Sequence, residues 1–321
     1  MTMTSSCIAV IGAGLAGLAC AKELSQAGKS VTVFEKARGP GGRLSSRRRL
    51  GSTFDIGAQQ LTASQPAFAR QLDHWEKAGC LKPWQGSDTS PAWVGSPRMS
   101  ALTRHFSQGL HLVTGTRITH LQITTDKQWL LRDATGKTWG PFSQVVLATP
   151  ASQALPLIDR VSPTLKQQLQ SVKEEPIWVA YFALHSTTPP LAPCHQPASS
   201  YLRRATLLNS KPDQASALER WVIEATPQWS QQHLELSKEE VARRLFSIWA
   251  NDIALEVPSC PQLLEAHRWL YGLASSHRHE GFLEDREQQI LVCGDFCYGS
   301  TAEAAWMSGQ QSGQALLKTI Q

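Results

Sequence analysis

The segment Cys7–Gly17, CIAVIGAGLAG, decides the fold of this chain. Its first five residues form a continuous apolar run, which is the pattern of a parallel strand that is buried on both faces. The glycines that follow, Gly12, Gly14 and Gly17, have the spacing of a dinucleotide-binding turn. Because this turn leads directly into a predicted helix over Leu15–Ala27, the segment predicts a strand, a tight turn and a helix in that order.

A second strand and an acidic residue complete the unit. Val31–Phe34 is apolar, and Glu35 follows it. In such units the acid accepts hydrogen bonds from the adenosine ribose, while the helix N-terminus binds the pyrophosphate. A carboxylate here repels a 2′-phosphate, so the predicted adenosine is not of the NADP kind. The predicted contacts are Gly12, Ala13, Gly14, Leu15, Ala16, Gly17 and Glu35. They leave both FAD and NAD open.

A second glycine loop favours FAD. Lys36–Leu44, KARGPGGRL, places adjacent glycines and cations where an NAD-binding domain normally continues into its crossover helix. An arginine at this loop can bind two phosphate oxygens. In the later segment Phe54–Gln60, FDIGAQQ, small residues would let the backbone approach a flat ring. The cofactor-binding residues predicted here are Lys36, Gly42, Arg43, Gly57, Ala58, Gln59 and Gln60. Arg47–Arg49 is interpreted either as an extended anion site or as a solvated basic loop.

The C-terminal block predicts a third part of the cofactor site. Gln289–Asp295 is an apolar strand that ends in Gly-Asp, and a helix is expected from about Thr301 to Leu317. A helix N-terminus stabilises the negative charge that a reduced flavin carries. Small residues on this helix, Ser308, Gly309 and Gly313, permit close packing.

Taken together, these motifs resemble the amine-oxidase-like FAD superfamily. That superfamily joins the dinucleotide turn to a Glu-Lys-x-x-x-x-Gly-Gly-Arg stretch, here residues 35–43, and to a D-x-G-A segment, here residues 55–58. Within the superfamily the chain is most similar to bacterial renalases. The segments that carry this similarity are Phe54–Gln60, Trp93–Gly95, Met99–Leu102, His267–Tyr271 and the C-terminal block. Arg98 departs from the glycine that usually precedes Met99, which affects how that loop closes.

The resemblance also implies roles for particular residues. Asp295 is expected to bind the ribityl or pyrophosphate part of FAD, and the backbone of Ile118 is expected to contact adenine. The helix N-terminus at Ala302, Glu303 and Ala304 is expected to point at the flavin pyrimidine.

The predicted fold class is α/β. It combines an FAD-binding Rossmann-like domain of the amine-oxidase type with an inserted α+β substrate domain built on an antiparallel sheet. The FAD-binding domain is assigned to residues 1–60, 98–155 and 282–321, and the substrate domain to 61–97 and 156–281. In the strand predicted over Leu263–Leu273, alternation places His267, Trp269 and Tyr271 on one face. These three are the predicted catalytic residues on the substrate side, although a hydrogen-bonded core histidine is an open alternative.

Composition narrows the function classes. The chain has 321 residues, which suggests two domains, and 41% hydrophobic with 18% charged residues excludes a disordered or fibrous chain. A net charge of +5 is too weak to indicate nucleic-acid binding but suits an anionic ligand. Seven cysteines without a CxxC pair predict neither a disulfide framework nor a metal site, and His277–His279 is interpreted as a solvated loop. No apolar run is long enough for a membrane span, the N-terminus shows no signal-peptide pattern, and a cytoplasmic location is expected.

The predicted function is therefore a flavin oxidase with non-covalent FAD. FAD would accept a hydride at N5 and pass the electrons to O₂, giving H₂O₂. The renalase resemblance implies that the substrates are the misreduced 2- or 6-dihydro isomers of NAD(P), which are returned as NAD(P)⁺ in metabolite repair. An amine oxidase is the alternative, with an aromatic cage of Trp178, Tyr181, Trp269 and Tyr271. A flavin-binding regulatory protein without turnover also stays open. The expected partners are a dinucleotide or small-molecule substrate and O₂, without nucleic acid or membrane, and the oligomeric state is left open.

Overall fold

A computed structural model describes residues 7–87, 89, 91–185, 191–195, 197–253, 261–276 and 280–319. The chain divides into two compact units. The first unit comprises Met1–Gly42, Thr103–Glu174 and Ala274–Gln321, and the second comprises Arg43–Leu102 and Glu175–Leu273. Each unit is assembled from segments that lie far apart in the sequence. Among the described residues, no helix combines the length and the apolar character needed to cross a bilayer.

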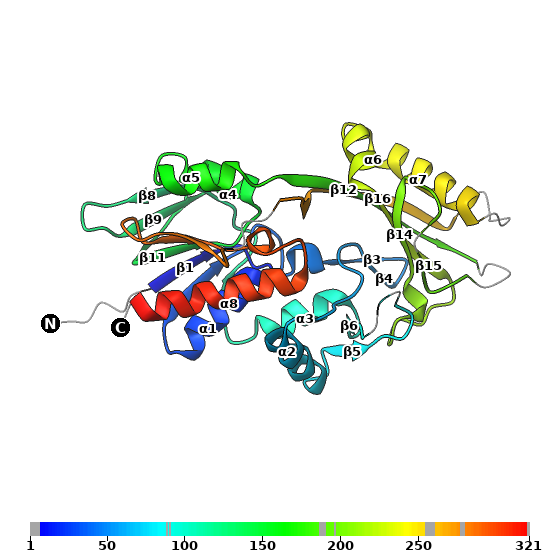
Figure 1. Ribbon diagram of the computed structural model, residues 1–321, viewed down its shortest axis with the longest axis horizontal. Coiled ribbons are helices and arrows are strands. Elements are labelled where there is room, and N and C mark those ends of the chain that lie inside the picture. The colour runs from blue at the N-terminus through cyan, green and yellow to red at the C-terminus, as the bar shows by residue number, and fades with distance from the viewer. Residues whose placement is uncertain are drawn as a thin grey trace. The chain divides into compact units, whose positions relative to one another are not determined.

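The first unit contains a Rossmann-like sheet (Figure 1). Its strands, in order across the sheet, are β17 (Leu283–Asp285), β18 (Ile290–Val292), β11 (Gln144–Leu147), β1 (Cys7–Ile11), β2 (Ser30–Phe34) and β7 (His111–Val113). Neighbouring strands pair in parallel, except that β17 is antiparallel to β18. Residues 8–11 of β1 are buried on both faces, as the apolar run predicts for a central parallel strand.

Helices cover one face of this sheet. They are α1 (Leu15–Gln26) and α8 (Ala302–Thr319), which pack against each other. A Cβ added to Gly309 of α8 would lie 2.0 Å from the carbonyl oxygen of Ala16, so this glycine is required for the close approach of the two helices. Gly309, one of the small residues predicted to permit close packing, therefore serves a contact between two helices.

The opposite face of the sheet carries a second layer. It consists of α4 (Ala151–Ile158), α5 (Pro163–Gln170) and an antiparallel three-stranded sheet of β8 (Ile118–Ile123), β9 (Trp129–Asp133) and β10 (Thr138–Phe142). Ala9 and Ile11 of β1 share one buried apolar core with Trp129 and Leu131 of β9. Burial on both faces holds β1 rigidly, and this strand leads into the glycine turn.

The second unit is built on a five-stranded sheet. Its strands, in order, are β13 (Cys194–His195), β14 (Leu202–Leu207), β15 (Glu219–Ala225), β12 (Glu174–Leu184) and β16 (Leu263–Ala274). The faces of β12 alternate, so that Trp178 and Phe182 pack towards α6 (Pro227–Gln232) and α7 (Lys238–Ile253). Tyr181 lies on the other face, in a core with Phe54.

Smaller elements complete the chain. They are the hairpin β3 (Ser46–Arg49) and β4 (Ser52–Asp55), the pair β5 (Leu81–Pro83) and β6 (Trp93–Gly95), the helices α2 (Pro66–Lys77) and α3 (Met99–Phe106), and the short 3-10 turns η1 (Gly42–Leu44), η2 (Leu208–Ser210) and η3 (Asp295–Cys297).

The predicted fold class is confirmed: a Rossmann-like α/β part is accompanied by an additional sheet domain. The compact units divide the chain at other residues than the predicted domains do. Residues 43–60 belong to the second unit, because β4 packs against β12 there. Residues 156–174 belong to the first unit, because α4 and α5 cover its sheet.

Candidate functional site

The glycine turn after β1 has two positions that exclude any side chain. A Cβ added to Gly12, whose φ is +111°, would lie 2.6 Å from the Ala148 carbonyl oxygen. A Cβ added to Gly17 would lie 1.9 Å from the carbonyl oxygen of Gly12 itself. Gly14 differs, since its φ of −76° suits any residue and an added Cβ would meet nothing within 4 Å. The fold thus does not require glycine at position 14, and the open space fits the close approach of a ligand to the backbone.

The N-terminus of α1 is suited to an anion. Gly14 is its N-cap residue and supplies no side-chain hydrogen bond, and the first turn contains no acidic residue. The helix therefore presents N–H groups and the positive end of its dipole without a side chain of its own that neutralises them. Such a terminus binds phosphate. Leu15 and Ala16 are buried beneath this turn.

Glu35 is a buried carboxylate directly after β2. It is only 7% exposed, and its two oxygens accept hydrogen bonds from the backbone N–H groups of Ala13, at 2.9 Å, and Ala37, at 2.8 Å. A carboxylate can accept about four hydrogen bonds, so each oxygen keeps capacity for a ribose hydroxyl. The neighbouring Lys36 donates through Nζ to Oε1 of Gln153 at 2.8 Å.

Ile118 and Glu35 belong to neighbouring backbone segments. The N–H of Thr116 donates to the carbonyl oxygen of Glu35 at 2.9 Å, and Ile118 begins β8 two residues later. The structure thus brings the predicted adenine and ribose positions together. The contact of Ile118 with adenine stays a prediction.

The cofactor-binding residues predicted in the C-terminal block lie at or shortly before the start of α8. Asp295 is 5% exposed and accepts a 3.4 Å hydrogen bond from the hydroxyl of Ser300. Thr301 caps the helix, since its Oγ1 accepts from the N–H of Ala304 at 3.0 Å. The N-terminus of α8, with Ala302, Glu303 and Ala304, thus has a side-chain cap that α1 lacks, and the role of these residues toward a flavin stays a prediction.

Gly57 is explained by a protein contact. A Cβ added there would lie 1.9 Å from the carbonyl oxygen of Arg43, which also accepts from the N–H of Ala58 at 2.9 Å. The glycine thus lets residues 57–58 pack on the 42–44 turn, where the sequence suggested room for a flat ring. Arg43 donates through Nη1 to the carbonyl oxygen of Gly272 at 3.1 Å.

Gln59 and Gln60 are engaged with the protein. Gln59 is 2% exposed and donates through Nε2 to the carbonyl oxygens of Asp55, at 2.6 Å, and Gly57, at 2.8 Å. Its Oε1 accepts from Nζ of Lys211 at 3.1 Å. Gln60 accepts from Ser87 and donates to Thr89, both at 2.7 Å. Gln59 therefore orders its own loop, and the prediction that one of the two glutamines addresses a flavin gains no support from these contacts.

A buried ion pair supports this loop. Lys211 and Asp55 have fully buried side chains, and Nζ lies 3.3 Å from Oδ2. Asp55 also accepts from Ser46, the Met99 N–H and Gln214. Burial opposes ionisation of Asp55, but Lys211 and these donors outweigh it and hold its pKa below the usual range. Nothing in the sequence signals this pair, because its members lie far apart along the chain.

The predicted catalytic residues lie on one face of β16. Nδ1 of His267 lies 3.0 Å from Nη2 of Arg47, and the rings of His267 and Trp269 meet edge to face at 4.4 Å. Because a guanidinium only donates, Nδ1 must accept, and His267 is neutral. Trp269 donates to the carbonyl oxygen of Ile56 at 2.8 Å, and Tyr271 is half-buried on the same face.

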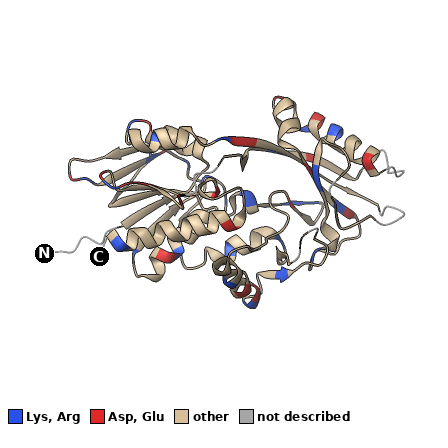
Figure 2. Ribbon diagram, viewed as in Figure 1, with Lys and Arg blue, Asp and Glu red and all other residues tan. Residues whose placement is uncertain are grey.

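The Arg47–Arg49 segment is a strand and not a loop, and Figure 2 shows it as a basic stretch at β3. Arg47 and Arg49 point to one side, where Arg49 pairs with Glu265 at 2.7 Å. Glu265 in turn accepts from the Tyr181 hydroxyl at 2.5 Å. Burial first, and then this carboxylate, raise the pKa of Tyr181 to about 12. Arg48, on the other side, is exposed.

The predicted four-residue aromatic cage does not form. Trp178 packs in the core beneath α6 and α7, whereas Tyr181 lies on the opposite face of β12. The physical reason is strand alternation, which separates residues of odd and even number. Arg268, which alternation places on the opposite face of β16 from His267, donates to the carbonyl oxygen of Leu234 and lies over the Trp178 ring. His277–His279 lies outside the described residues.

We predict that His267 makes stability depend on pH. Burial, followed by Arg47 and Lys238, lowers its pKa to about 4, against an ordinary value of about 6.5. The unfolded chain thus binds more protons between these values, so the free energy of unfolding falls as the pH decreases through this window. In urea titrations at pH 7 and pH 5, His267→Gln should lose less stability than the wild type over the same interval. An equal loss in both proteins would contradict the assignment.

Comparison with known proteins agrees with this geometry. A family model described as an NAD(P)-binding Rossmann-like domain matches residues 10–75. The 4,4'-diapophytoene desaturase of Staphylococcus haemolyticus (strain JCSC1435) is 52% identical over 50 residues, and that of Staphylococcus aureus (strain Newman) is 50% identical over 50 residues. Each match covers 16% of this chain and 10% of the desaturase. The chain thus matches about a tenth of the length of these curated relatives.

Solved structures are similar over the whole chain. A crystal structure from Exiguobacterium sp. 255-15, provisionally described as a protoporphyrinogen oxidase, has a TM-score of 0.79 at 11% identity and covers 100% of both chains. A variant of putrescine oxidase, from a redesign of cofactor binding, has a TM-score of 0.74 at 13% identity and covers 98% of this chain and 99% of its own.

The turn, the helix N-terminus without a side-chain cap and the buried acid all lie in the Rossmann-like part of the chain, within the region that the family model matches. The fold of the chain is similar to that of these two solved structures over nearly its whole length.

Proposed function

We propose that the protein is an FAD-dependent oxidoreductase whose first unit binds the adenosine diphosphate part of FAD. The residues there fit the group: the N-terminus of α1 would hold the pyrophosphate, with Gly14 allowing close approach, and Glu35 would hold the ribose. Bound FAD supplies two-electron chemistry, taking a hydride from a reduced substrate and giving the electrons to O₂ with formation of H₂O₂.

We further propose that the FAD is non-covalent. Cys297 is one of two cysteines that lie two residues from Asp295 in the C-terminal block, and like Cys293 it is fully buried. Burial raises the pKa of this thiol to about 11, so the nucleophilic thiolate is scarce near neutral pH.

The substrates we propose are the 2- or 6-dihydro isomers of NAD(P), which the enzyme would return as NAD(P)⁺. The observation that best supports this proposal concerns Arg47. This residue is half-buried, and its guanidinium donates a hydrogen bond to the neutral His267. Among the described residues, no carboxylate forms an ion pair with Arg47. With Arg49 already paired to Glu265, this face of β16 keeps one uncompensated positive charge, which suits a phosphate-bearing substrate better than a cationic amine.

Each residue of this face has a defined task in the proposal. His267 holds the Arg47 guanidinium in place by accepting one of its hydrogen bonds. Because His267 is neutral, it adds no second positive charge beside the guanidinium. Trp269, fixed by the carbonyl of Ile56, offers a flat apolar surface to a nucleoside ring. A hydride donor needs no strong general base, which agrees with the low pKa of His267.

The decisive experiment is anaerobic stopped-flow reduction of the purified yellow protein by dihydronicotinamide isomers and by primary amines. We expect rapid bleaching by the 2- or 6-dihydro isomers and no bleaching by amines. Rapid bleaching by amines alone would overturn the substrate assignment and leave the FAD assignment intact.

A matched pair of variants tests the role of Arg47. Arg47→Gln should raise the substrate concentration for half-maximal reduction about tenfold or more, because a charge-assisted hydrogen bond contributes about 1.5–3 kcal/mol. Arg48→Gln removes the same charge from the other side of β3, where the side chain is exposed, and should leave that concentration within about twofold. Equal effects of the two substitutions would show that only the net charge matters.

A further inference from the structure

A pocket in the second unit shares no residue with the β16 face. Its volume is about 360 Å³, and its wall combines apolar residues, among them Leu50, Phe54 and Leu218, with the polar residues Ser52, Ser216 and Arg220. This volume is at the lower end of the range of small-molecule sites. Any ligand must therefore be small.

Arg220 gives the pocket a buried cation with a free donor. The residue is 3% exposed, and Nη1 donates to the carbonyl oxygen of Thr53 at 2.5 Å while Nη2 donates to that of Gln214. Its Nε is buried and has no partner among the described residues. A buried donor without an acceptor is costly, and a ligand oxygen would remove this cost.

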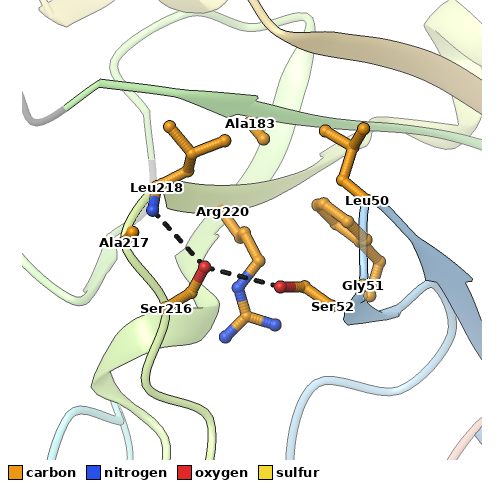
Figure 3. A pocket seen from close by; sticks show the side chains of 9 residues that line it. Leu50, Gly51, Ser52, Ala183, Ser216, Ala217, Leu218 and Arg220 are labelled. Atoms are coloured by element: carbon orange, nitrogen blue, oxygen red, sulfur yellow. Dashed lines mark hydrogen bonds between the residues drawn. The ribbon is translucent and has the colours of Figure 1, made fainter.

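Two weakly engaged hydroxyls accompany the guanidinium. Figure 3 shows the Arg220 side chain between Ser216 and Ser52 in this view. The two hydroxyl oxygens lie 3.5 Å apart, and Ser216 accepts a 3.4 Å hydrogen bond from the N–H of Leu218. Both contacts are long for hydrogen bonds, so the hydroxyls can turn to an anionic oxygen.

The charges nearby leave one positive charge uncompensated. Asp55 attracts Arg220, but its oxygens accept their hydrogen bonds from Lys211, Gln214, Ser46 and the Met99 N–H. The buried group of Asp55, Lys211 and Arg220 thus contains two cations and one anion, because the carboxylate of Glu224, which also attracts Lys211, is already paired with Arg203 at 3.0 Å. A ligand with a single negative charge would balance it.

Leu50 belongs to the apolar part of the pocket wall. It lies in the two-residue turn between β3 and β4, with φ of +49° and an exposed fraction of 58%. Asparagine, aspartate or glycine normally occupies such a position, because a leucine there is strained and gains nothing from burial. A ligand tail that covers the side chain would account for leucine at this place.

We propose that this pocket binds a small monocarboxylate with a short apolar tail. The carboxylate accepts hydrogen bonds from Nε of Arg220 and from the hydroxyls of Ser52 and Ser216. The tail contacts Leu50, Phe54 and Leu218. A phosphate fits less well, because the pocket offers one excess charge and its wall is largely apolar.

The test is calorimetric titration of the purified holoprotein with hexanoate, hexanol and hexylamine, which share one tail. We expect hexanoate to bind at least about tenfold more tightly than the other two, since only it accepts charge-assisted hydrogen bonds. Equal affinities for the three probes would overturn the proposal.

Substitutions of pocket residues test whether hexanoate binds in this pocket. The double variant Ser52→Ala with Ser216→Ala should weaken hexanoate binding about tenfold, and Leu50→Asn should weaken it while stabilising the turn. Leu270→Asn changes another exposed leucine, on β16, and should leave binding unchanged. Hexanoate binding that is unaltered in both pocket variants would overturn the proposal. Because these readouts do not involve turnover, their outcome is independent of the proposed oxidase function.

Discussion

Gly14→Ala is expected to abolish most FAD retention while leaving the apoprotein folded. The added Cβ meets no protein atom within 4 Å, and the φ of −76° is ordinary for alanine. The methyl group would nevertheless stand where the pyrophosphate must approach the backbone. Losing one charge-assisted hydrogen bond, about 1.5–3 kcal/mol, corresponds to roughly 10- to 100-fold weaker binding. The flavin content of the purified variant and its affinity for added FAD measure the effect.

Two further glycine-to-alanine substitutions serve as controls for Gly14→Ala. Gly17→Ala places a Cβ 1.9 Å from the Gly12 carbonyl oxygen, so the apoprotein itself should lose about 1–3 kcal/mol of unfolding free energy. Gly39→Ala also enters open space and should affect neither property. If Gly14→Ala kept its full flavin content, or lost it only together with its fold, the assigned role of Gly14 would be wrong.

Lys211→Met is expected to destabilise the protein by about 3–5 kcal/mol, because it leaves the Asp55 carboxylate buried without its cation. It also removes the donor to Oε1 of Gln59. Adding Asp55→Asn to Lys211→Met should recover part of the loss, since the buried charge disappears. Urea unfolding at pH 7 measures each free energy.

An exposed ion pair provides the control. Lys82→Met breaks the 2.8 Å pair with Asp213, whose side chains are 46% and 37% exposed, and should cost at most about 1 kcal/mol. Similar losses for Lys82→Met and Lys211→Met would contradict the structural importance of the buried pair.

The first part of the Rossmann-like unit could be predicted closely from sequence because its signals are local. The strand, the glycines and the helix at 15–26 follow one another directly, and Glu35 comes at the end of the next strand. The spacing singled out Gly12 and Gly17, and at both positions an added Cβ would meet backbone atoms at less than 3 Å. The match of the Rossmann-like family model over residues 10–75 covers the same region.

The second unit was harder to predict because its contacts join distant segments. Gln59 was interpreted as facing a ligand, but Lys211, from a segment with no distinguishing motif, binds its amide oxygen. Residues 43–60 continue the cofactor motifs along the chain and yet pack with β12. The alternation that correctly grouped His267 with Trp269 also separates Trp178 from Tyr181, and this excludes the proposed cage.

The central claim is that the first unit binds FAD, and acid denaturation of the purified protein tests it most directly. We expect a yellow protein that releases about one FAD per chain into the acid supernatant, identified by its mass, with no flavin left on the polypeptide. A colourless protein that takes up no FAD on reconstitution would contradict the account.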